Sequence, residues 1–344
     1  MGYRFIKVIQ NIYEIAFLFS FMRQSYSLEQ LQKIFSSFPG TGTIRKSFLF
    51  TSGFENSNYY AETDVGWYVI KIFEGMGVSR ETILFEIEVM VCCTEGKLQT
   101  PTLLRSKKNT YYAPFEGKIA IVMDYLPGDN LQGKKMSSSL VQEIGDQVGR
   151  MDALLSKFKD GSKTRQNYEW DLKNFLQLEP SLQKLPSSFD RELLQKIFDQ
   201  FKAIKPIFDT LPRGLIHNDL AAHNFLARRG KLTGIIDFSD MAFSPYIQNI
   251  AVFLCQSVFA YNWQPRQVNV FLQAYQKHNH LSAKELCILY DLVLARYAQI
   301  IVEFNRWNVD YGEEQQRTEY IKDYYHFLKK FMNITRTEFQ RLCS

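Results

Sequence analysis

The chain has 344 residues, of which 46% are apolar and 22% are charged, and it carries a formal net charge of +5. This size and composition are typical of a globular protein with one large two-lobed unit or two modest domains. The 28 Phe and 19 Tyr residues exclude an intrinsically disordered chain. The basic residues are spread along the sequence, which argues against a nucleic-acid-binding surface. Five cysteines without a Cys-x-x-Cys pair predict buried thiols in a reducing cytoplasm rather than disulfides or a zinc site.

Residues 1–25 form an N-terminal extension that is largely apolar but is interrupted by Lys7 and Glu14. Its cleanest apolar run, 15–22, is much shorter than the roughly 20 residues that span a bilayer. The extension also lacks a small-residue cleavage site, so a signal peptide is not expected. We predict an amphipathic helix that packs on the body of a cytoplasmic protein without an integral membrane span. Contact with a membrane surface is the alternative.

The stretch 26–126 combines short strand-like runs with helical segments. Ser27 and Gln30 predict a capping box at the start of the first helix, which ends at Pro39-Gly40. Runs of β-forming residues predict strands at 47–51, 58–62, 66–73 and 118–126, and a longer helix is expected at 79–95. This portion is therefore predicted to be a sheet with one main helix.

Beyond Gly128 the pattern becomes mostly helical. Apolar residues recur at helical spacing in the segments 140–155, 190–210, 246–259, 265–277, 283–307 and 317–332. A short β-like region at 214–238 is the exception. We therefore predict an α+β fold in which a lobe with an antiparallel N-terminal sheet, 26–126, precedes a larger, mostly helical lobe, 127–344.

A polar loop in the β-like region carries candidate catalytic residues. His217-Asn218-Asp219 is followed by Asn224, and a short apolar strand then ends at Asp237. Phosphoryl transfer from ATP requires a carboxylate that orients the accepting hydroxyl and oxygen ligands that hold magnesium. Asp219, Asn224 and Asp237 can supply these groups, although each alone fits equally well as a turn former or a strand terminator. His217 is expected to support the loop by hydrogen bonding.

The spacing of His-x-Asp, an asparagine five residues after the aspartate, and then Asp-Phe resembles the motifs of the aminoglycoside phosphotransferase-like kinases. The resemblance implies a bilobal protein-kinase-like fold that uses ATP and Mg²⁺. It further implies that Asp219 is the catalytic base and that Asn224 and Asp237 are magnesium ligands.

The sheet-containing lobe adds a candidate ion pair. Lys71 lies on the predicted strand 66–73, where a phosphate-binding lysine is expected, and Glu86 lies on the helix that follows. Glu86 shares the apolar face of this helix, and a carboxylate on such a face is costly unless it is paired. A Lys71–Glu86 pair is therefore predicted, with Glu88 as the alternative partner.

Two further segments are candidates for contact with the nucleotide. The turn at 52–57 is expected to cover the ATP phosphates, although Gly53 is its one glycine. Asp124 and Leu126 lie in the predicted hinge between the lobes, where backbone amides and carbonyls are expected to bind adenine. The sheet-containing lobe is accordingly predicted to bind nucleotide, and the helical lobe to hold the catalytic loop and the acceptor.

Within the superfamily, the sequence is most similar to the homoserine kinase (type II) branch with the choline-kinase-type fold. The likeness rests on Ser52–Tyr59, Tyr68–Glu74 and Leu126–Gly128, and it covers roughly residues 26–310. Asn249 departs from the branch, because an aspartate with a structural role usually stands at this position.

The resemblance implies phosphorylation of a hydroxyl on a small amino alcohol or amino acid, with homoserine as the first candidate. Choline, ethanolamine, hydroxylysine and aminoglycosides fit the same catalytic core. Arg296 is a candidate for binding a substrate carboxylate, and a structural salt bridge is its alternative role. Two alternative functions are of another kind: a non-catalytic kinase-like binding module, and a phosphotransferase that acts on a protein. The joint presence of Lys71, Asp219, Asn224 and Asp237 argues against the non-catalytic module.

Overall fold

The computed structural model describes residues 25–344 except 51–54, 75–77, 262 and 313. The predicted N-terminal helix and Gly53 therefore lie outside the described residues. The chain divides into two compact units, the first ending at Leu126 and the second running from Pro127 to Ser344. The segment Glu95–Thr100 belongs to the second unit, although it precedes the last strands of the first.

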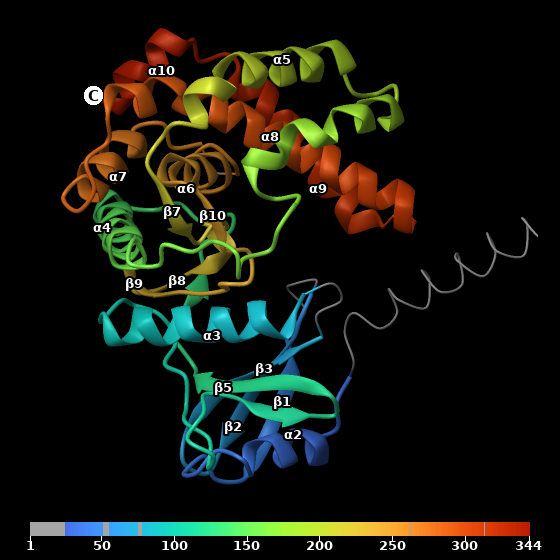
Figure 1. Cartoon of the computed structure of the whole chain (residues 1–344), viewed down its shortest axis with the longest axis vertical. Helices are drawn as coiled ribbons and strands as arrows, with labels where there is room; N and C mark the ends of the chain where they lie inside the picture. Colours follow the sequence, from blue (N-terminus) through green and yellow to red (C-terminus); the bar gives the residue numbers. More distant parts are fainter. Residues whose placement is uncertain (1–24, 51–54, 75–77, 262, 313) are drawn as a thin grey trace, which may run out of the picture. The chain divides into compact units, whose positions relative to one another are not determined.

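The first unit contains a five-stranded sheet in the order β1-β2-β3-β5-β4 (Figure 1). Each pair of neighbouring strands is antiparallel. The strands are β1 (Ile44–Leu49), β2 (Ser57–Thr63), β3 (Trp67–Phe73), β4 (Ala113–Phe115) and β5 (Lys118–Asp124). Because β3 pairs with both β2 and β5, its residues lie in the middle of the sheet.

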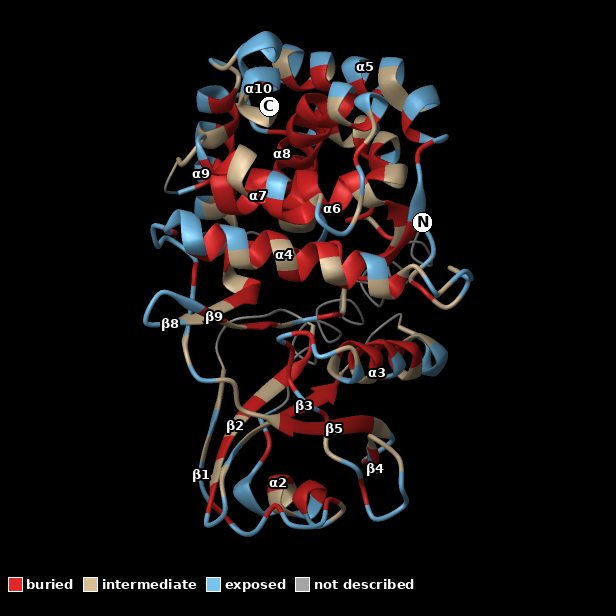
Figure 2. Ribbon diagram, turned by 90° about the vertical axis from the view of Figure 1, so that its left-hand side faces the viewer, coloured by how far each residue is buried: buried red, intermediate tan, exposed pale blue. Residues whose placement is uncertain are grey.

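Two helices lie on opposite sides of this sheet (Figures 1 and 2). The helix α2 (Leu28–Phe35) begins with the predicted capping box, in which Ser27 accepts from the Gln30 amide and the Gln30 side chain accepts from Ser27. Its apolar face packs with Ile70 and other buried residues of the sheet. The longer helix α3 (Arg80–Glu95) lies on the other side. Lys71 is adjacent to Ile70 on β3 and so points to the side of α3.

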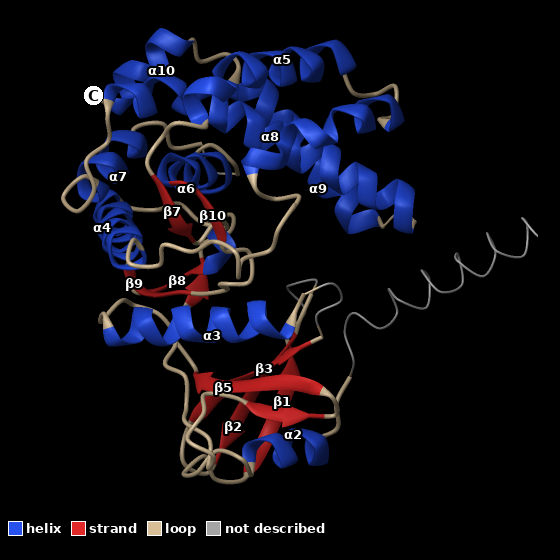
Figure 3. Ribbon diagram, viewed as in Figure 1, coloured by secondary structure: helices blue, strands red, loops and turns tan. Residues whose placement is uncertain are grey.

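The second unit is mostly helical (Figure 3). Its α-helices are α4 (Ser138–Leu155), α5 (Arg191–Phe208), α6 (Tyr246–Phe253), α7 (Gln267–Tyr275), α8 (Ala283–Tyr311), α9 (Gln315–Phe331) and α10 (Arg336–Cys343). The helix α8 is buried almost continuously from Ile288 to Asn305, and α5, α6, α9 and α10 pack against it, whereas α4 packs against α7 (Figure 2). Although α8 carries buried polar residues such as Arg296 and Glu303, most of its buried positions are apolar, as expected of a helix in the core of such a unit.

Short strands interrupt the helices and carry the polar loop found in the sequence. β7 (Arg213–Ile216) pairs with β10 (Ala242–Pro245), and β6 (Asp129–Asn130), β8 (Phe225–Arg228) and β9 (Lys231–Ile235) form a three-stranded sheet. The segment Ala222–Asn224, between β7 and β8, is a single 3₁₀ turn, η2. All the strand pairs are antiparallel.

Some elements were not expected from the sequence. The helix predicted at 246–259 is α6 followed by a π-helix, η3 (Leu254–Val258), and a 3₁₀ segment, η1 (Leu172–Lys184), contains Pro180. The last helix, α10, was also not predicted. The expectation of buried thiols is correct for Cys92, Cys93 and Cys255 but wrong for Cys287, which is exposed, and for Cys343, which is half-buried.

The predicted α+β fold, with an antiparallel N-terminal sheet and a larger helical region, is confirmed. None of the helices within the described part of the chain has both the length and the apolar content needed to cross a membrane.

Candidate active site

The polar loop 217–224 joins β7 to β8. His217 follows the last residue of β7 and is fully buried, and its Nε2 lies 3.2 Å from the carbonyl oxygen of Ile236. Its Nδ1 accepts a hydrogen bond from the Asp219 amide at 3.3 Å. Burial lowers the pKa of His217, which favours the neutral imidazole that these two contacts require. The predicted supporting role of His217 agrees with these contacts.

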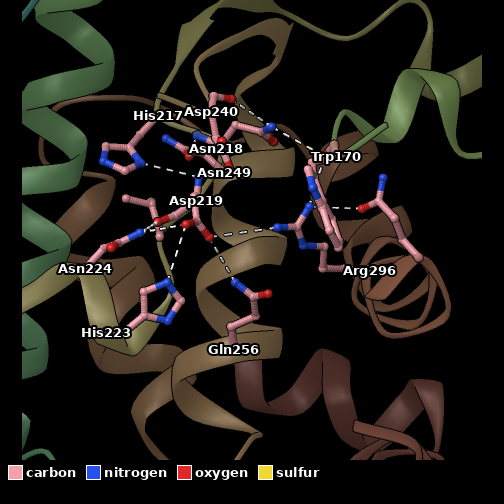
Figure 4. Close-up of polar contacts among 12 residues, drawn as sticks. Trp170, His217, Asn218, Asp219, His223, Asn224, Asp240, Asn249, Gln256 and Arg296 are labelled. Atoms are coloured by element: carbon pink, nitrogen blue, oxygen red, sulfur yellow. Dashed lines mark hydrogen bonds and ion pairs between the residues drawn. The ribbon is translucent and has the colours of Figure 1, made fainter. Parts of the chain in front are cut away.

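The Asp219 carboxylate is held by side chains from three parts of the second unit (Figure 4). Asn224 Nδ2 donates to Oδ2 at 2.6 Å and also to the Asp219 carbonyl at 2.9 Å. His223 Nε2 lies 3.6 Å from Oδ2, and Gln256 Nε2 donates to Oδ1 at 3.3 Å. Arg296 Nη2 lies 4.0 Å from Oδ1. The carboxylate is thus fixed in position while 17% of the side chain stays accessible.

These partners also determine the charge of Asp219. Burial alone would raise the pKa of this carboxyl, but the close approach and charge of His223, followed by the charge of Arg296, outweigh that effect and hold the pKa well below its usual range. Asp219 is therefore ionised at neutral pH. Burial lowers the pKa of His223, but the Asp219 carboxylate more than offsets this and raises it overall, with smaller contributions from Asp237 and Asp240.

The two candidate metal ligands are brought together by the backbone. The Ile236 amide donates to the Asn224 carbonyl at 3.0 Å, which fixes the residue before Asp237 next to Asn224. Asp237 follows the end of β9, has a φ of 66° and is exposed, whereas Phe238 after it is fully buried. The Asn224 amide nitrogen is committed to Asp219, which leaves Oδ1 for a cation. The described residues contain no cluster of three or more His, Cys, Asp or Glu side chains that could hold a metal.

The predicted ion pair of the first unit is present. Lys71 Nζ donates to Glu86 Oε1 at 2.7 Å, and both side chains are buried. Lys71 also lies 4.9 Å from the centre of the Phe73 ring. The alternative partner, Glu88, is exposed. A buried lysine must be paired, and Glu86 meets this need because it is on the buried face of α3.

A family model places this geometry among known proteins. The model of the phosphotransferase enzyme family, abbreviated APH, matches residues 49–286, which is more than half of the chain. The chain belongs to this family. The predicted superfamily and the prediction of an enzyme that transfers a phosphoryl group to a hydroxyl are thereby confirmed.

Curated relatives of this APH-family chain include small-molecule kinases. A homoserine kinase from Methylobacillus flagellatus is 26% identical over 264 residues, which cover 75% of this chain and 78% of that protein. A hydroxylysine kinase from Mus musculus is 27% identical over 195 residues, which cover 53% of this chain and about half, 52%, of the relative. The predicted likeness to the homoserine kinase branch is confirmed, whereas two relatives with different acceptors do not single out one acceptor for this chain.

Solved structures of APH-like kinases share the fold. A microcompartment-associated aminopropanol kinase aligns with a TM-score of 0.69 and 14% identity over 92% of this chain and all of that one. An amicoumacin kinase, solved with AMP-PNP and Ca²⁺, aligns with a TM-score of 0.66 and 18% identity over 90% of this chain and 98% of that one. At this identity the likeness supports the fold.

The predicted hinge residues lie at the end of β5. The Asp124 carboxylate accepts from the Thr102 amide, and the Asp124 amide donates to the Thr102 carbonyl at 3.1 Å. Burial raises the pKa of Asp124, although these hydrogen bonds oppose the shift. The Asp124 side chain thus anchors the segment around Thr102, and Leu126 is half-buried two residues later. A contact of either residue with adenine stays a prediction.

Arg296 lies on α8 and is 2% exposed. Nη1 donates to the Trp170 carbonyl at 2.9 Å and to Gln299 Oε1 at 3.0 Å, and the guanidinium lies 5.3 Å from the Trp170 ring. Nη2 faces Asp219, as Figure 4 shows. Arg296 therefore contacts the candidate catalytic base, Asp219, directly. Its predicted contact with a substrate carboxylate stays a prediction.

Three residues of the site were not identified from the sequence. His223 lies one turn beyond Asp219 within the motif itself, so its position could have indicated the contact. Gln256 comes from the π-helix η3, and no local pattern connects it with a loop so far away in sequence. Asn218 stands at a position that the motif leaves open, yet it is fully buried, and Gln248 Nε2 donates to its Oδ1 at 2.7 Å.

Proposed function

We propose that this APH-family chain is an ATP- and Mg²⁺-dependent kinase for the hydroxyl group of a small amino alcohol or hydroxy amino acid. Homoserine is the first candidate acceptor. The observation that carries the proposal is the Asp219 carboxylate, which is ionised, fixed by Asn224 and Gln256, and still accessible. Such a carboxylate suits an acceptor hydroxyl that must be aligned for phosphoryl transfer.

In the proposed reaction, the acceptor oxygen forms a bond to the γ-phosphorus as the bond to the ADP oxygen breaks. The hydroxyl proton is hydrogen-bonded to Asp219 and leaves as the new bond forms. A carboxylate with a lowered pKa is a weak base, but the loose transition state of phosphoryl transfer places little demand on basicity before bond formation. Asp219 therefore acts mainly by orienting the hydroxyl and by accepting its proton late.

The proposed magnesium ligands are Asn224, through Oδ1, and Asp237. One amide oxygen and one carboxylate fit a hard cation that keeps phosphate oxygens and water as its other ligands. When bound, the ion would neutralise charge on the phosphates of ATP. The protein's own contribution is the bond from the Ile236 amide to the Asn224 carbonyl, which holds the backbone before Asp237 beside Asn224.

The proposed nucleotide-binding residues of the first unit are Lys71, Glu86, Asp124 and Leu126. Glu86 fixes the Lys71 ammonium at 2.7 Å, so that the cation is oriented before a phosphate arrives. Asp124 and Leu126 are proposed to offer backbone groups to the adenine. In this proposal the predicted sheet-containing lobe, 26–126, binds nucleotide and the predicted helical lobe, 127–344, provides the catalytic loop and the acceptor site.

The acceptor is tested with a panel that separates the candidate classes. The purified chain is incubated with ATP, Mg²⁺ and L-homoserine, 5-hydroxylysine, choline, ethanolamine or an aminoglycoside, and ADP formation is measured. Homoserine is expected to give the largest kcat/KM, and 5-hydroxylysine is the second candidate because hydroxylysine kinases are among the relatives. If none of these acceptors raised the rate of ADP formation above the rate without acceptor, the proposed acceptor class would be contradicted.

The panel also tests the predicted carboxylate contact of Arg296. If Arg296 binds a substrate carboxylate, Arg296→Lys should raise KM for homoserine more than KM for ethanolamine, because the lysine cannot make the bidentate contact. An equal loss of kcat for both acceptors would instead assign Arg296 to the support of Asp219. A protein acceptor would be indicated by phosphate transfer to polypeptide in place of the small molecules.

A further inference from the structure

Asn218, the residue before the proposed base, has an unusual backbone. Its φ is 65°, in the left-handed region that residues other than glycine adopt at a cost. The side chain is fully buried and donates through Nδ2 to the Asp240 carbonyl at 3.1 Å. Its amide donates to Asn249 Oδ1 at 3.0 Å. Because Asp219 follows directly, the Asn218 backbone determines where the Asp219 carboxylate points.

The partner of the Asn218 amide is itself held by a buried carboxylate. Asn249 Nδ2 donates to Asp152 Oδ1 at 2.9 Å, and the Tyr275 hydroxyl donates to Asp152 Oδ2 at 2.9 Å. Asn249 and Asp152 are both fully buried. The chain of contacts therefore runs from Tyr275 through Asp152 and Asn249 to the Asn218 amide.

This chain depends on a close approach of α4 and α7. A Cβ atom at Gly149 on α4 would lie 2.7 Å from the carbonyl oxygen of Tyr275, closer than packed atoms tolerate. Glycine at 149 thus lets the two helices meet. As a result, the hydroxyl of Tyr275 on α7 reaches Asp152, which lies one turn further along α4.

The direction of the hydrogen bonds explains why position 249 is an asparagine here. An amide can turn either way, but Asp152 offers an acceptor, so it takes the NH₂ group of Asn249 and leaves Oδ1 towards the Asn218 amide. An aspartate at 249 would replace the amide donor with a second acceptor about 3 Å from Asp152 Oδ1, and two such buried carboxyl groups can stay in contact only by sharing a proton. Asp152 and Asn249 are therefore a matched pair of acceptor and donor.

We propose that Asp152 is a positioning residue for phosphoryl transfer, which acts through Asn249 on the Asn218 amide and thereby aims Asp219. The inference rests on the proposed function in that it takes Asp219 as the group that contacts the acceptor. It goes beyond that function because it adds a residue remote from the loop.

The experiment exchanges the two side chains. Asn249→Asp alone should lower kcat for L-homoserine about tenfold to a hundredfold, the range expected when a reacting group is misplaced. Asp152→Asn alone should cost less, because its carbonyl can still accept from Asn249. The double variant Asp152→Asn/Asn249→Asp restores every donor and acceptor: Asn at 152 donates to Asp at 249, which accepts from the Asn218 amide. It should regain most of the lost kcat with KM for ATP unchanged.

Hydrogen exchange at the Asn218 amide gives a readout that needs no turnover. Protection of this amide should fall in Asn249→Asp and return in the double variant. The matched control is Asp146→Asn combined with Asn249→Asp, since Asp146 is on α4 but pairs with His278 and should rescue nothing.

Two outcomes would overturn the inference. One is a folded double variant whose kcat and amide protection are no better than those of Asn249→Asp, and the other is equal rescue by Asp146→Asn. A wild-type chain without activity on homoserine would count against the proposed acceptor, but amide exchange would still decide the positioning role.

Discussion

His223 and Asp219 show how neighbouring charges adjust a single catalytic group. His223 Nε2 lies 3.6 Å from Asp219 Oδ2, and the close approach and charge of His223 make the largest contribution that lowers the pKa of Asp219. Burial works in the opposite direction. The balance leaves an ionised carboxylate in a site from which most water is excluded.

Removal of His223 should therefore raise the pKa of the proposed base, Asp219. In His223→Ala, we expect the acidic limb of the kcat/KM profile to shift to higher pH, because the carboxyl keeps its burial but loses its main stabilising partner. Because the wild-type pKa lies well below the usual carboxyl range, kcat/KM of the variant should fall towards acid between pH 8 and pH 4, where the ionisation of Asp219 does not reduce that of wild type. His278→Ala serves as the control, since His278 pairs with Asp146 on the surface. Superimposable profiles for His223→Ala and wild type would contradict the account.

Asp237 should determine the Mg²⁺ concentration that the enzyme needs for activity. Asp237→Asn keeps the size of the side chain but removes its charge, so half-maximal activity is expected to need roughly 10–100-fold more Mg²⁺, as when a metal site is disturbed. A magnesium titration at fixed ATP measures this. Asp240→Asn is the matched control, because Asp240 accepts from the Tyr168 hydroxyl. An equal increase in the Mg²⁺ requirement of Asp240→Asn would contradict a specific role of Asp237 in metal binding.

At the scale of elements, β3 and α3 are joined by the buried Lys71–Glu86 pair. Lys71→Met should lower the free energy of unfolding by about 3–5 kcal/mol, because it removes the ammonium that pairs with the buried Glu86 carboxylate. Lys71→Met/Glu86→Gln should recover most of this stability without restoring activity, since the cation proposed to bind phosphate is still missing. Urea unfolding and kcat separate the two effects. Glu88→Gln, exposed on the same helix, should change neither quantity, and activity in the double variant would refute the role of Lys71 in catalysis.

The contact between α4 and α7 should make stability depend on pH. Burial raises the pKa of Asp152 from 3.8 to about 7, although Tyr275 and Asn249 oppose the shift. Between these two values the folded chain holds a proton that the unfolded chain has released, so stability falls as pH rises from about 4 to 7 and levels off above that. The free energy of unfolding of wild type minus that of Asp152→Asn should therefore decrease by up to about 4 kcal/mol over this range. A difference that stays constant between pH 4 and pH 8 would contradict the raised pKa.

For the whole molecule, local patterns in the sequence predicted the main strands and the central helix of the first unit and most of the longer helices of the second, but not the short strands β4, β6 and β10 or the last helix α10. The capping box at Ser27, the strand around Lys71 and the helix around Glu86 each carry a signal within a few residues, and the structure contains all three. The motif spacing likewise placed Asp219 and Asn224 in one loop, where they are hydrogen-bonded.

Contacts between residues that lie far apart in the sequence could not be predicted in this way. Asn249 was recognised as a departure from the branch, but its reason lies in Asp152, 97 residues earlier. Gln256, which donates to Asp219, belongs to the π-helix that continues α6, and a helical period does not reveal such a segment. In both cases tertiary packing, not local propensity, brings the side chains together.

The most direct test of the account follows phosphoryl transfer by ³¹P NMR, with the intact chain, ATP, Mg²⁺ and L-homoserine or the most active acceptor of the panel. The wild type is predicted to convert ATP to ADP with the appearance of a phosphomonoester. Asp219→Asn, with an unchanged circular dichroism spectrum and melting temperature, is predicted to be slower by about 10²–10⁴-fold. A folded Asp219→Asn variant that forms the phosphomonoester at the wild-type rate would contradict the central claim.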